Sequence, residues 1–339
     1  MNFSLKNRKQ DHLDICLNQP IEHGSTGFEN YSLIHQALPD YNLKDIDLSV
    51  KFLGKKLQAP IIIASMTGGT DIATKMNQQL AQIAEEFNIG MGVGSQRIAI
   101  KNSKPNQDFQ LRKWIPNSLL LGNLGAIQLN YGFSIKHYQL AVDMLQADGL
   151  YLHLNPLQEA LQPEGETNFA GLEKKLLQLK KNINVPIIIK EVGQGISTET
   201  AKKLKKMGFS IIEATGKGGV SWTLIETIRS KSSMGATFAD WGISTAKSLE
   251  NCRKVPGLTI IAGGGIRTGI DIAKSICLGA SLISIGLPIL KAVNKSKQAA
   301  KEYLQTIIKE LKIALFCLGV KNLEELKKNS KVLLKKNTN

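Results

Sequence analysis

Two glycine-rich turns near the end of the chain have the composition of a phosphate-binding site. Residues 262–269 read AGGGIRTG and residues 284–288 read SIGLP, and each turn follows a short apolar run. Glycine lets backbone N–H groups approach a phosphate closely, and the N-terminus of a following helix adds a favourable dipole. One such turn is weak evidence. Two turns after successive apolar runs predict a bound phosphate that belongs to a cofactor or a substrate.

Polar and cationic residues follow most of the other apolar runs. A structural role could explain any one of them: His153 could equally be a hydrogen-bonded histidine at the end of a strand. The whole set is difficult to explain by packing, because buried polar groups need partners. The set comprises Ser65, Thr67, Ser95, Gln96, Arg97, Asn123, His153, Asn155, Lys190, Glu191, Thr215 and Lys217.

Short apolar segments that alternate with longer helical ones must position these residues. Runs such as APIIIAS (59–65) and VPIIIKE (185–191) are apolar without alternation, which is typical of parallel strands buried on both faces. Apolar spacing and capping residues predict helices at 71–87, 198–207 and 268–278. The eight predicted strands are 60–65, 90–94, 119–123, 150–154, 186–191, 211–215, 258–262 and 282–286.

This alternation predicts an α/β fold, a closed (β/α)8 TIM barrel. A doubly wound open sheet would need a GxGxxG turn after an early strand, but the first strand is followed by MTGGT. In a barrel the carboxyl ends of the strands meet at one rim, and a phosphate often binds after strands 7 and 8. The polar residues and the glycine turns would therefore come together. At that rim of a flavin barrel, Lys190 could stabilise negative charge on a reduced ring.

We expect three parts along the chain. Residues 1–58 form an N-terminal extension that covers the barrel and contributes to the substrate site, and residues 59–320 form the barrel. Residues 321–339 form a C-terminal helix and a loose lysine-rich tail. A broad apolar face along residues 296–318 predicts a long helix that packs on the barrel wall.

The composition excludes several classes of protein. The net charge is +15, but the lysines are scattered and aromatic residues make up only 6% of the chain, so no basic strip interleaved with aromatics predicts nucleic-acid binding. The first twenty residues lack the apolar stretch of a signal peptide, and the apolar runs are too short to span a bilayer. We expect a cytoplasmic protein that binds no membrane, with a charge that suits anionic small substrates.

The chain resembles type 2 isopentenyl diphosphate isomerase, the FMN-dependent family, over nearly its whole length. Other flavin barrels share the glycine turns but lack SQR and NPLQE, so the set of motifs is specific. The motifs are RKQDH (8–12), HQALP (35–39), MTGG (66–69), GVGSQR (92–97), GNLGA (122–126), HLNPLQE (153–159) with Gly165 and Glu166, KEVG (190–193), GKGGVSW (216–222) and DWGIS (240–244).

The resemblance implies a reduced FMN on the barrel rim, with NADPH as its reductant. Its ring and ribityl chain would be surrounded by Ala64, Ser65, Met66, Thr67, Ser95, Asn123, Lys190 and Thr215. Its phosphate would be held by Gly264, Gly265, Arg267, Gly286 and Leu287.

The resemblance also implies a site for a small-molecule diphosphate and for Mg²⁺. Glu159 would bind the Mg²⁺, which usually takes one or two carboxylates and completes its shell with phosphate oxygens and water. The substrate diphosphate would be bound by Arg8, Lys9, Ser95, Gln96 and Arg97, with Gln158 close to the reacting end.

The implied reaction interconverts isopentenyl and dimethylallyl diphosphate in isoprenoid biosynthesis. It adds a proton at one carbon and removes another nearby. An unactivated alkene is a weak base, and neither a cysteine nor a carboxylate pair is placed for this work, so we expect the reduced flavin to exchange the protons. The side chains that would orient the reacting groups and tune the flavin are Gln158, His153, Asn155 and Lys190.

Two rival functions and the assembly remain open at this stage. An FMN oxidoreductase of the same barrel type would need a clamp for a substrate carboxylate, whereas the basic residues suit a diphosphate better. A flavin barrel acting on tRNA would need an RNA-binding extension, and too few residues follow 318 for one. The resemblance suggests a homotetramer, in which Arg8 and Lys9 could serve a neighbouring subunit.

Overall fold

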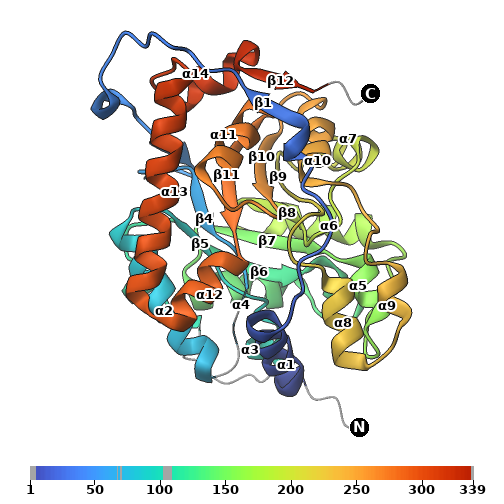
Figure 1. The fold of residues 1–339 in the computed structure, drawn as a ribbon. Coiled ribbons are helices and arrows are strands. Elements are labelled where there is room, and N and C mark those ends of the chain that lie inside the picture. Colours follow the sequence, from blue (N-terminus) through green and yellow to red (C-terminus); the bar gives the residue numbers. More distant parts are fainter. Residues whose placement is uncertain (1–4, 67, 69–70, 102–108, 337–339) are drawn as a thin grey trace.

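The computed structural model describes residues 5–66, 68, 71–101 and 109–336. Eight parallel strands close into a barrel in the order β10-β11-β4-β5-β6-β7-β8-β9 (Figure 1). All eight predicted strands are confirmed, with ends that differ by a few residues. The barrel strands are β4 Ile61–Ile63, β5 Gly90–Gly92, β6 Leu120–Gly125, β7 Gly149–Leu154, β8 Ile187–Glu191, β9 Ile211–Thr215, β10 Thr259–Gly263 and β11 Ala280–Ile285.

Helices connect the strands and form the outer layer. The three predicted helices are confirmed, and capping explains where two of them begin: the hydroxyls of Ser197 and Thr268 accept from the backbone N–H of Thr200 and Asp271. The helices after the first strand are α2 Asp71–Glu86, α3 Arg97–Lys101, α4 Ile135–Leu145, α5 Pro156–Leu161, α6 Leu172–Asn182, α7 Thr198–Lys206, α8 Trp222–Ser230, α9 Met234–Thr237, α10 Thr245–Arg253, α11 Gly269–Cys277, α12 Leu287–Lys295, α13 Lys297–Cys317 and α14 Leu323–Lys328. Single 3-10 turns lie at Phe28–Asn30 (η1), Leu43–Asp45 (η2), Arg112–Trp114 (η4), Ala126–Asn130 (η5) and Ser330–Val332 (η6).

The N-terminal segment reaches both ends of the barrel. A hairpin of β2 Val50–Phe52 and β3 Lys55–Leu57 packs Phe52 and Leu57 against the buried side chains of the barrel interior. A Cβ on Gly149, the first residue of β7, would lie 2.9 Å from Leu53, so this hairpin lies at the amino ends of the strands. The helix α1 Leu5–Asn18 lies at the opposite end, where it packs on α8 and α12 (Figure 1).

The prediction of a loose C-terminal tail is wrong for residues 330–336. Residues Leu333–Lys335 form β12, which pairs antiparallel with β1 Tyr31–Leu33. The Lys336 N–H donates to the Asn30 carbonyl at 2.8 Å, and the Lys335 ammonium donates to Glu250 at 3.0 Å. Lysine content suggested disorder, but backbone pairing with a distant segment decides the structure.

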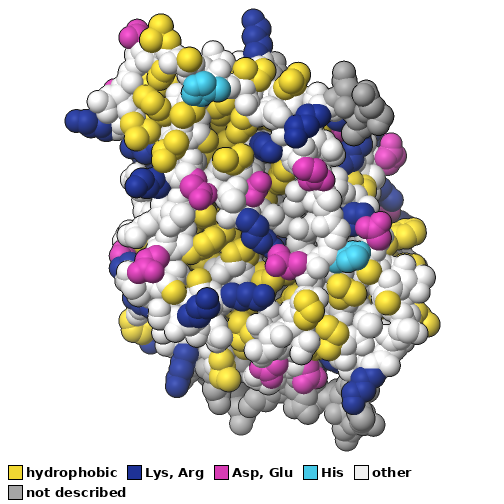
Figure 2. Space-filling model, viewed as in Figure 1, with side chains coloured by type: hydrophobic (Ala, Val, Ile, Leu, Met, Phe, Trp, Pro, Cys, Tyr) yellow, Lys and Arg dark blue, Asp and Glu magenta, His cyan; other side chains and the backbone are white. Residues whose placement is uncertain are grey.

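The long helix α13 confirms the predicted amphipathic stretch, with Leu304, Ile307, Leu311 and Leu315 buried on one face. Among the residues described here, none of the helices has the length and apolar character that a bilayer crossing requires. On the face drawn in Figure 2, lysine and arginine side chains are scattered and intermingled with acidic ones.

Candidate functional site

A cavity opens at the carboxyl ends of the barrel strands, and α1 lines its outer side. Almost every residue that the sequence analysis selected lies in its wall. Thr67 is the exception that cannot be placed, because it lies outside the described residues. The selected residues that line the cavity are Arg8, Lys9, Ala64, Ser65, Met66, Ser95, Arg97, Asn123, His153, Asn155, Gln158, Glu159, Lys190, Thr215, Gly264, Gly265, Arg267, Gly286 and Leu287.

Gln96, unlike the other residues predicted to bind the substrate, does not line this cavity. Its side chain is fully buried, and its amide nitrogen donates to the Ala141 carbonyl at 2.9 Å. Its amide oxygen accepts from the Asn123 N–H at 3.0 Å. Both ends of the amide therefore fasten the β5–α3 loop to α4 and β6, while Ser95 and Arg97 on either side face the cavity.

The glycine turn after β10 forms a tight cradle in one wall. Gly264 and Gly265 have φ of 93° and 70°, a region that favours glycine. A Cβ on Gly264 would lie 2.1 Å from the Gly216 carbonyl oxygen, so a side chain there would clash. Next to this turn α12 begins at Leu287, and Gly286 offers no side chain to cap it. Backbone N–H groups and a helix N-terminus of this kind fit a phosphate.

Arg267 adds a cationic group to the cradle. Its guanidinium forms an ion pair with Glu22, and its NH1 donates to the Ile266 carbonyl at 2.9 Å. Burial lowers the pKa of Arg267 below its usual value. The sequence analysis missed Glu22, which lies in an irregular segment before the barrel.

The floor of the cavity carries a buried ion pair. Lys190 on β8 pairs with Glu213 on β9, and its ammonium also donates to the Thr215 hydroxyl at 3.2 Å. Burial and the neighbouring Glu213 raise the pKa of Tyr151 well above its usual value, so this phenol stays protonated beside the pair. Sequence reasoning missed Glu213, although a carboxylate inside the apolar run IIEAT is a usable signal.

His153 on β7 is a neutral imidazole. Its Nδ1 lies 2.9 Å from the Asn123 amide oxygen. The Asn123 amide nitrogen donates to the Val93 carbonyl at 3.1 Å, so its oxygen must face the ring and accept from Nδ1–H. Burial, with the nearby charges of Lys190, Arg97 and Arg8, lowers the pKa of His153 to about 3. The Nε2 atom is therefore an acceptor, and the ring is no acid at neutral pH.

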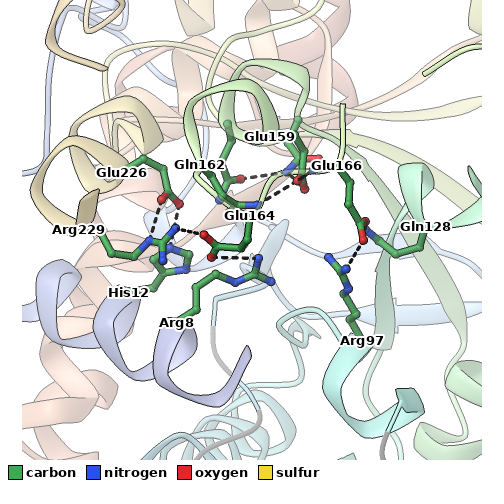
Figure 3. Close-up of polar contacts among 12 residues, drawn as sticks. Arg8, His12, Arg97, Gln128, Glu159, Gln162, Glu164, Glu166, Glu226 and Arg229 are labelled. Atoms are coloured by element: carbon green, nitrogen blue, oxygen red, sulfur yellow. Dashed lines mark hydrogen bonds and ion pairs between the residues drawn. The ribbon is translucent and has the colours of Figure 1, made fainter. Parts of the chain in front are cut away.

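Glu159 on α5 is the one carboxylate in the predicted NPLQE motif, and it is almost fully buried. Its oxygens accept from the side-chain amides of Asn155 and Gln162, each at 3.0 Å, and from the Glu166 N–H at 2.8 Å (Figure 3). Within the described part of the chain, no group of three or more His, Cys, Asp or Glu side chains could hold a metal ion. A single carboxylate still fits Mg²⁺ when phosphate oxygens complete the shell.

A second polar network joins α1 to α8 (Figure 3). His12 Nε2 lies 2.9 Å from Glu226, and Arg229 donates to both Glu226 and Glu164 at 2.8 and 2.9 Å. Glu164 also lies 3.7 Å from the Arg8 guanidinium. Sequence reasoning missed Glu226 and Arg229, because the α8 segment carries no local motif and their partners His12 and Glu164 lie 214 and 65 residues away along the chain.

Several buried polar atoms in the wall have no hydrogen-bond partner among the described residues. Such atoms are costly unless a ligand satisfies them. Both donors and acceptors are present, which suits a ligand with polar groups of both kinds, such as a flavin ring and a phosphate. They are Ser65 Oγ, Arg97 Nε, Gln128 Oε1, Asn155 Oδ1 and Ser284 Oγ.

Comparisons with known proteins show which proteins the chain is similar to. A family model described as FMN-dependent dehydrogenase matches residues 17–111 and 152–333. The chain is 44% identical over 329 residues to an isopentenyl-diphosphate delta-isomerase from Nostoc sp., which covers 95% of this chain and 94% of that protein. It is 43% identical over 341 residues to the enzyme of the same name from Sulfurisphaera tokodaii, and this alignment covers 98% of this chain and 92% of that protein.

Solved structures of flavoenzymes share the fold. A mandelate oxidase variant with an FMN adduct aligns with a TM-score of 0.63 and 14% identity, over 96% of this chain and 95% of that one. A flavocytochrome b2 variant with sulfite bound aligns with a TM-score of 0.67 and 18% identity, over 91% of this chain and 77% of that one. At this level of identity the likeness concerns the fold alone.

Proposed function

Because this chain belongs to the FMN-dependent type 2 isopentenyl-diphosphate delta-isomerase family, we propose that its cavity interconverts isopentenyl and dimethylallyl diphosphate with reduced FMN and Mg²⁺. One observation carries the proposal: a phosphate cradle, a buried lysine in the floor and two arginines beside a buried glutamate all line one cavity. The carboxylate substrate of an oxidoreductase would be repelled by that glutamate, whereas Mg²⁺ would bridge a glutamate to a diphosphate.

The wall of the cavity would hold the FMN. Its phosphate would lie against Gly264, Gly265, Arg267, Gly286 and Leu287, and its ring and ribityl chain against Ala64, Ser65, Met66, Thr67, Ser95, Asn123, Lys190 and Thr215. When bound, reduced FMN supplies the acid and base that the double-bond shift requires. Lys190 would stabilise negative charge on the ring, and Glu213 would keep the lysine in place.

The substrate diphosphate would bind between α1, α3 and α5. Arg8, Lys9 and Arg97 supply positive charge, and burial together with the charge of Arg97 lowers the pKa of Arg8. The Lys9 ammonium donates to the Ser95 carbonyl at 2.7 Å, which ties α1 to the loop after β5. Glu159 would hold Mg²⁺ against the diphosphate. In this arrangement the charged end of the substrate is fixed before the alkene meets the reacting groups.

Three uncharged side chains would orient the alkene end. Gln158 accepts from the Asn155 amide at 3.1 Å, so its own amide nitrogen is directed elsewhere. His153 presents its unprotonated Nε2 and cannot protonate an alkene. The proton donor must therefore come from outside these three residues, which supports the role of the reduced cofactor.

Further parts of the proposal rest on the family resemblance and the sequence. We propose NADPH as the reductant of the flavin, a homotetramer as the assembly, the cytoplasm as the compartment and isoprenoid biosynthesis as the pathway.

The test is anaerobic turnover of isopentenyl diphosphate with FMN, Mg²⁺ and a trace of NADPH, with product counted against NADPH oxidised. We expect many products for each NADPH, because the isomerisation transfers no net electrons. One product per NADPH would identify an oxidoreductase. No product with a fully reduced flavin would overturn the proposal.

A further inference from the structure

We infer that Glu166 is a positioning residue, which holds Arg97 ready for the substrate diphosphate and connects it to Glu159. The inference rests on the proposed function, because it takes the diphosphate to be the ligand of Arg97. Glu166 lies in the loop between α5 and α6, and its carboxylate is buried.

Glu166 makes three contacts that each reach a different element (Figure 3). One carboxylate oxygen forms an ion pair with Arg97 NH2 on α3. The other oxygen accepts from the Gln128 amide in η5 at 2.9 Å. The backbone N–H of Glu166 donates to a carboxylate oxygen of Glu159 on α5 at 2.8 Å. Glu166 therefore holds both Arg97, which we expect to bind the diphosphate, and Glu159, which we expect to bind the metal.

The Arg97 guanidinium is only partly used by this contact. Glu166 pairs with NH2, while the buried Nε has no hydrogen-bond partner among the described residues. A guanidinium has five N–H donors in a fixed planar arrangement, so holding one nitrogen sets the direction of the others. Arg97 lines the cavity, and a phosphate oxygen is the acceptor that its unused donors fit.

The loop that carries Glu166 is pressed against α5. A Cβ on Gly165 would lie 1.7 Å from the Glu159 carbonyl oxygen, so only glycine allows this approach. The Gly165 N–H donates to the Gln162 carbonyl at 2.9 Å. The position of Glu166 is thus set by the backbone on either side and does not depend on its ion pair with Arg97.

The direction in which removal of Glu166 changes the affinity for an anion distinguishes two roles. Glu166 could position Arg97 for the anion, or it could compete with the anion for Arg97. If Glu166 only neutralised Arg97, its removal would free a cation and strengthen the binding of an anion. If Glu166 positions Arg97, its removal leaves a buried guanidinium unpaired, and the side chain moves out of the geometry that the diphosphate needs. The anchoring of Glu166 by Gln128 and by its own backbone favours the second result.

The experiment measures pyrophosphate binding to the FMN-loaded enzyme by calorimetry in the presence of Mg²⁺. We expect Glu166→Gln to raise the Kd at least about tenfold, a step of one order of magnitude in binding. Arg97→Gln should do the same, and the double variant should lose little more, because the two residues act as a unit. Glu173→Gln, which removes an exposed carboxylate paired with Lys203, is the matched control and should bind like the wild type.

Turnover gives the second readout. Glu166→Gln should raise KM for isopentenyl diphosphate by a similar factor with kcat within about twofold, the pattern of lost binding. Glu166→Asp keeps the charge and should recover most of the affinity, and it replaces Glu166→Gln as the deciding variant if the latter fails to load FMN. Unchanged or tighter pyrophosphate binding by Glu166→Gln overturns the inference, and so does Glu166→Asp if it binds pyrophosphate as weakly as Arg97→Gln. A wild-type enzyme that binds no pyrophosphate overturns the proposed diphosphate site itself.

Discussion

The ammonium of Lys190 and the carboxylate of Glu213 form a buried ion pair across two neighbouring strands of the barrel. The Thr215 hydroxyl completes the group, since it accepts from Lys190 at 3.2 Å and donates to Glu213 at 3.0 Å. The pair lies in the floor of the cavity, under the space assigned to the flavin. In the proposed arrangement, Glu213 would therefore control how much of the lysine's positive charge the ring experiences.

Removal of the Glu213 charge should make the bound flavin easier to reduce. In Glu213→Gln the positive charge of Lys190 is no longer compensated, and it stabilises the anionic reduced ring more strongly. We expect the midpoint potential to rise by about 30 mV or more, which corresponds to about 1.4 kcal/mol for a two-electron couple. Potentiometric titration of the FMN-loaded variant measures this shift. Lys190→Gln should lower the potential, and shifts of the same sign in both variants would contradict the assignment.

The Glu159 carboxylate should determine the Mg²⁺ dependence of the reaction. Glu159→Gln keeps the shape of the side chain and its contacts with Asn155 while removing the charge. We expect the Mg²⁺ concentration for half-maximal activity to rise roughly 10- to 100-fold, the range seen when metal sites are weakened. The flavin spectrum should stay unchanged, because Glu159 belongs to the diphosphate side of the cavity. A variant with wild-type Mg²⁺ dependence would remove Glu159 from the metal site.

The buried His153 should make the protein less stable in acid. Its pKa is depressed to about 3 in the fold, whereas an unfolded histidine titrates near 6.5, so the unfolded chain takes up the proton first. The stability that depends on a neutral His153 is complete above about pH 6.5 and decreases as the pH falls toward 3. The slope is at most about 1.4 kcal/mol per pH unit for one group.

Urea unfolding at several pH values checks this slope. His153→Asn should lose less stability than the wild type between about pH 6.5 and 4.5. Glu191 contributes in the opposite direction in both proteins, because burial raises its pKa to about 7 despite the N–H donors of Val192, Gly193 and Gln194. Its contribution cancels when the two slopes are compared. Equal slopes would show that His153 is not the group responsible.

A methyl group at position 165 should disturb the loop that carries Glu164 and Glu166. In Gly165→Ala the new Cβ would meet the Glu159 carbonyl oxygen, so the loop must move away from α5. We expect a loss of about 1–3 kcal/mol in unfolding free energy, as for other overpacked sites, and a rise in KM. Denaturant unfolding and steady-state kinetics measure the two effects. Gly171→Ala has open space around it and φ of 67°, so it serves as a control for backbone strain without a clash.

The barrel could be predicted because buried parallel strands leave a continuous apolar pattern that a single sequence shows. The site could be predicted as far as it lies at strand ends, where topology brings distant residues together. Gln96 shows the limit of this reasoning: it stands between two residues that face the cavity, yet its side chain points into the protein. The run SQR alone does not reveal which neighbours point the same way.

Other features depend on pairings that no local pattern records. Glu226 and Arg229 lie in an ordinary helix and meet the site because α8 packs on α1 and on α5. Residues 333–335 form a strand because they pair with β1, which lies about 300 residues earlier in the chain. Their lysine-rich composition alone predicted a loose tail. Glu166 and its partner Arg97 both stand in predicted motifs, but the sequence does not show that the two side chains form an ion pair.

The docking of α1 has a consequence for the newly made chain. His12 and its partner Glu226 are 214 residues apart, so α1 cannot form this contact until α8 has been made. At roughly 5–20 residues per second, that delay lasts about 10–40 s. During this time Arg8 and Lys9 are separated from the rest of the cavity. The side of the cavity that α1 lines is therefore completed only after the first six barrel strands, β4 to β9, and α8 have been made.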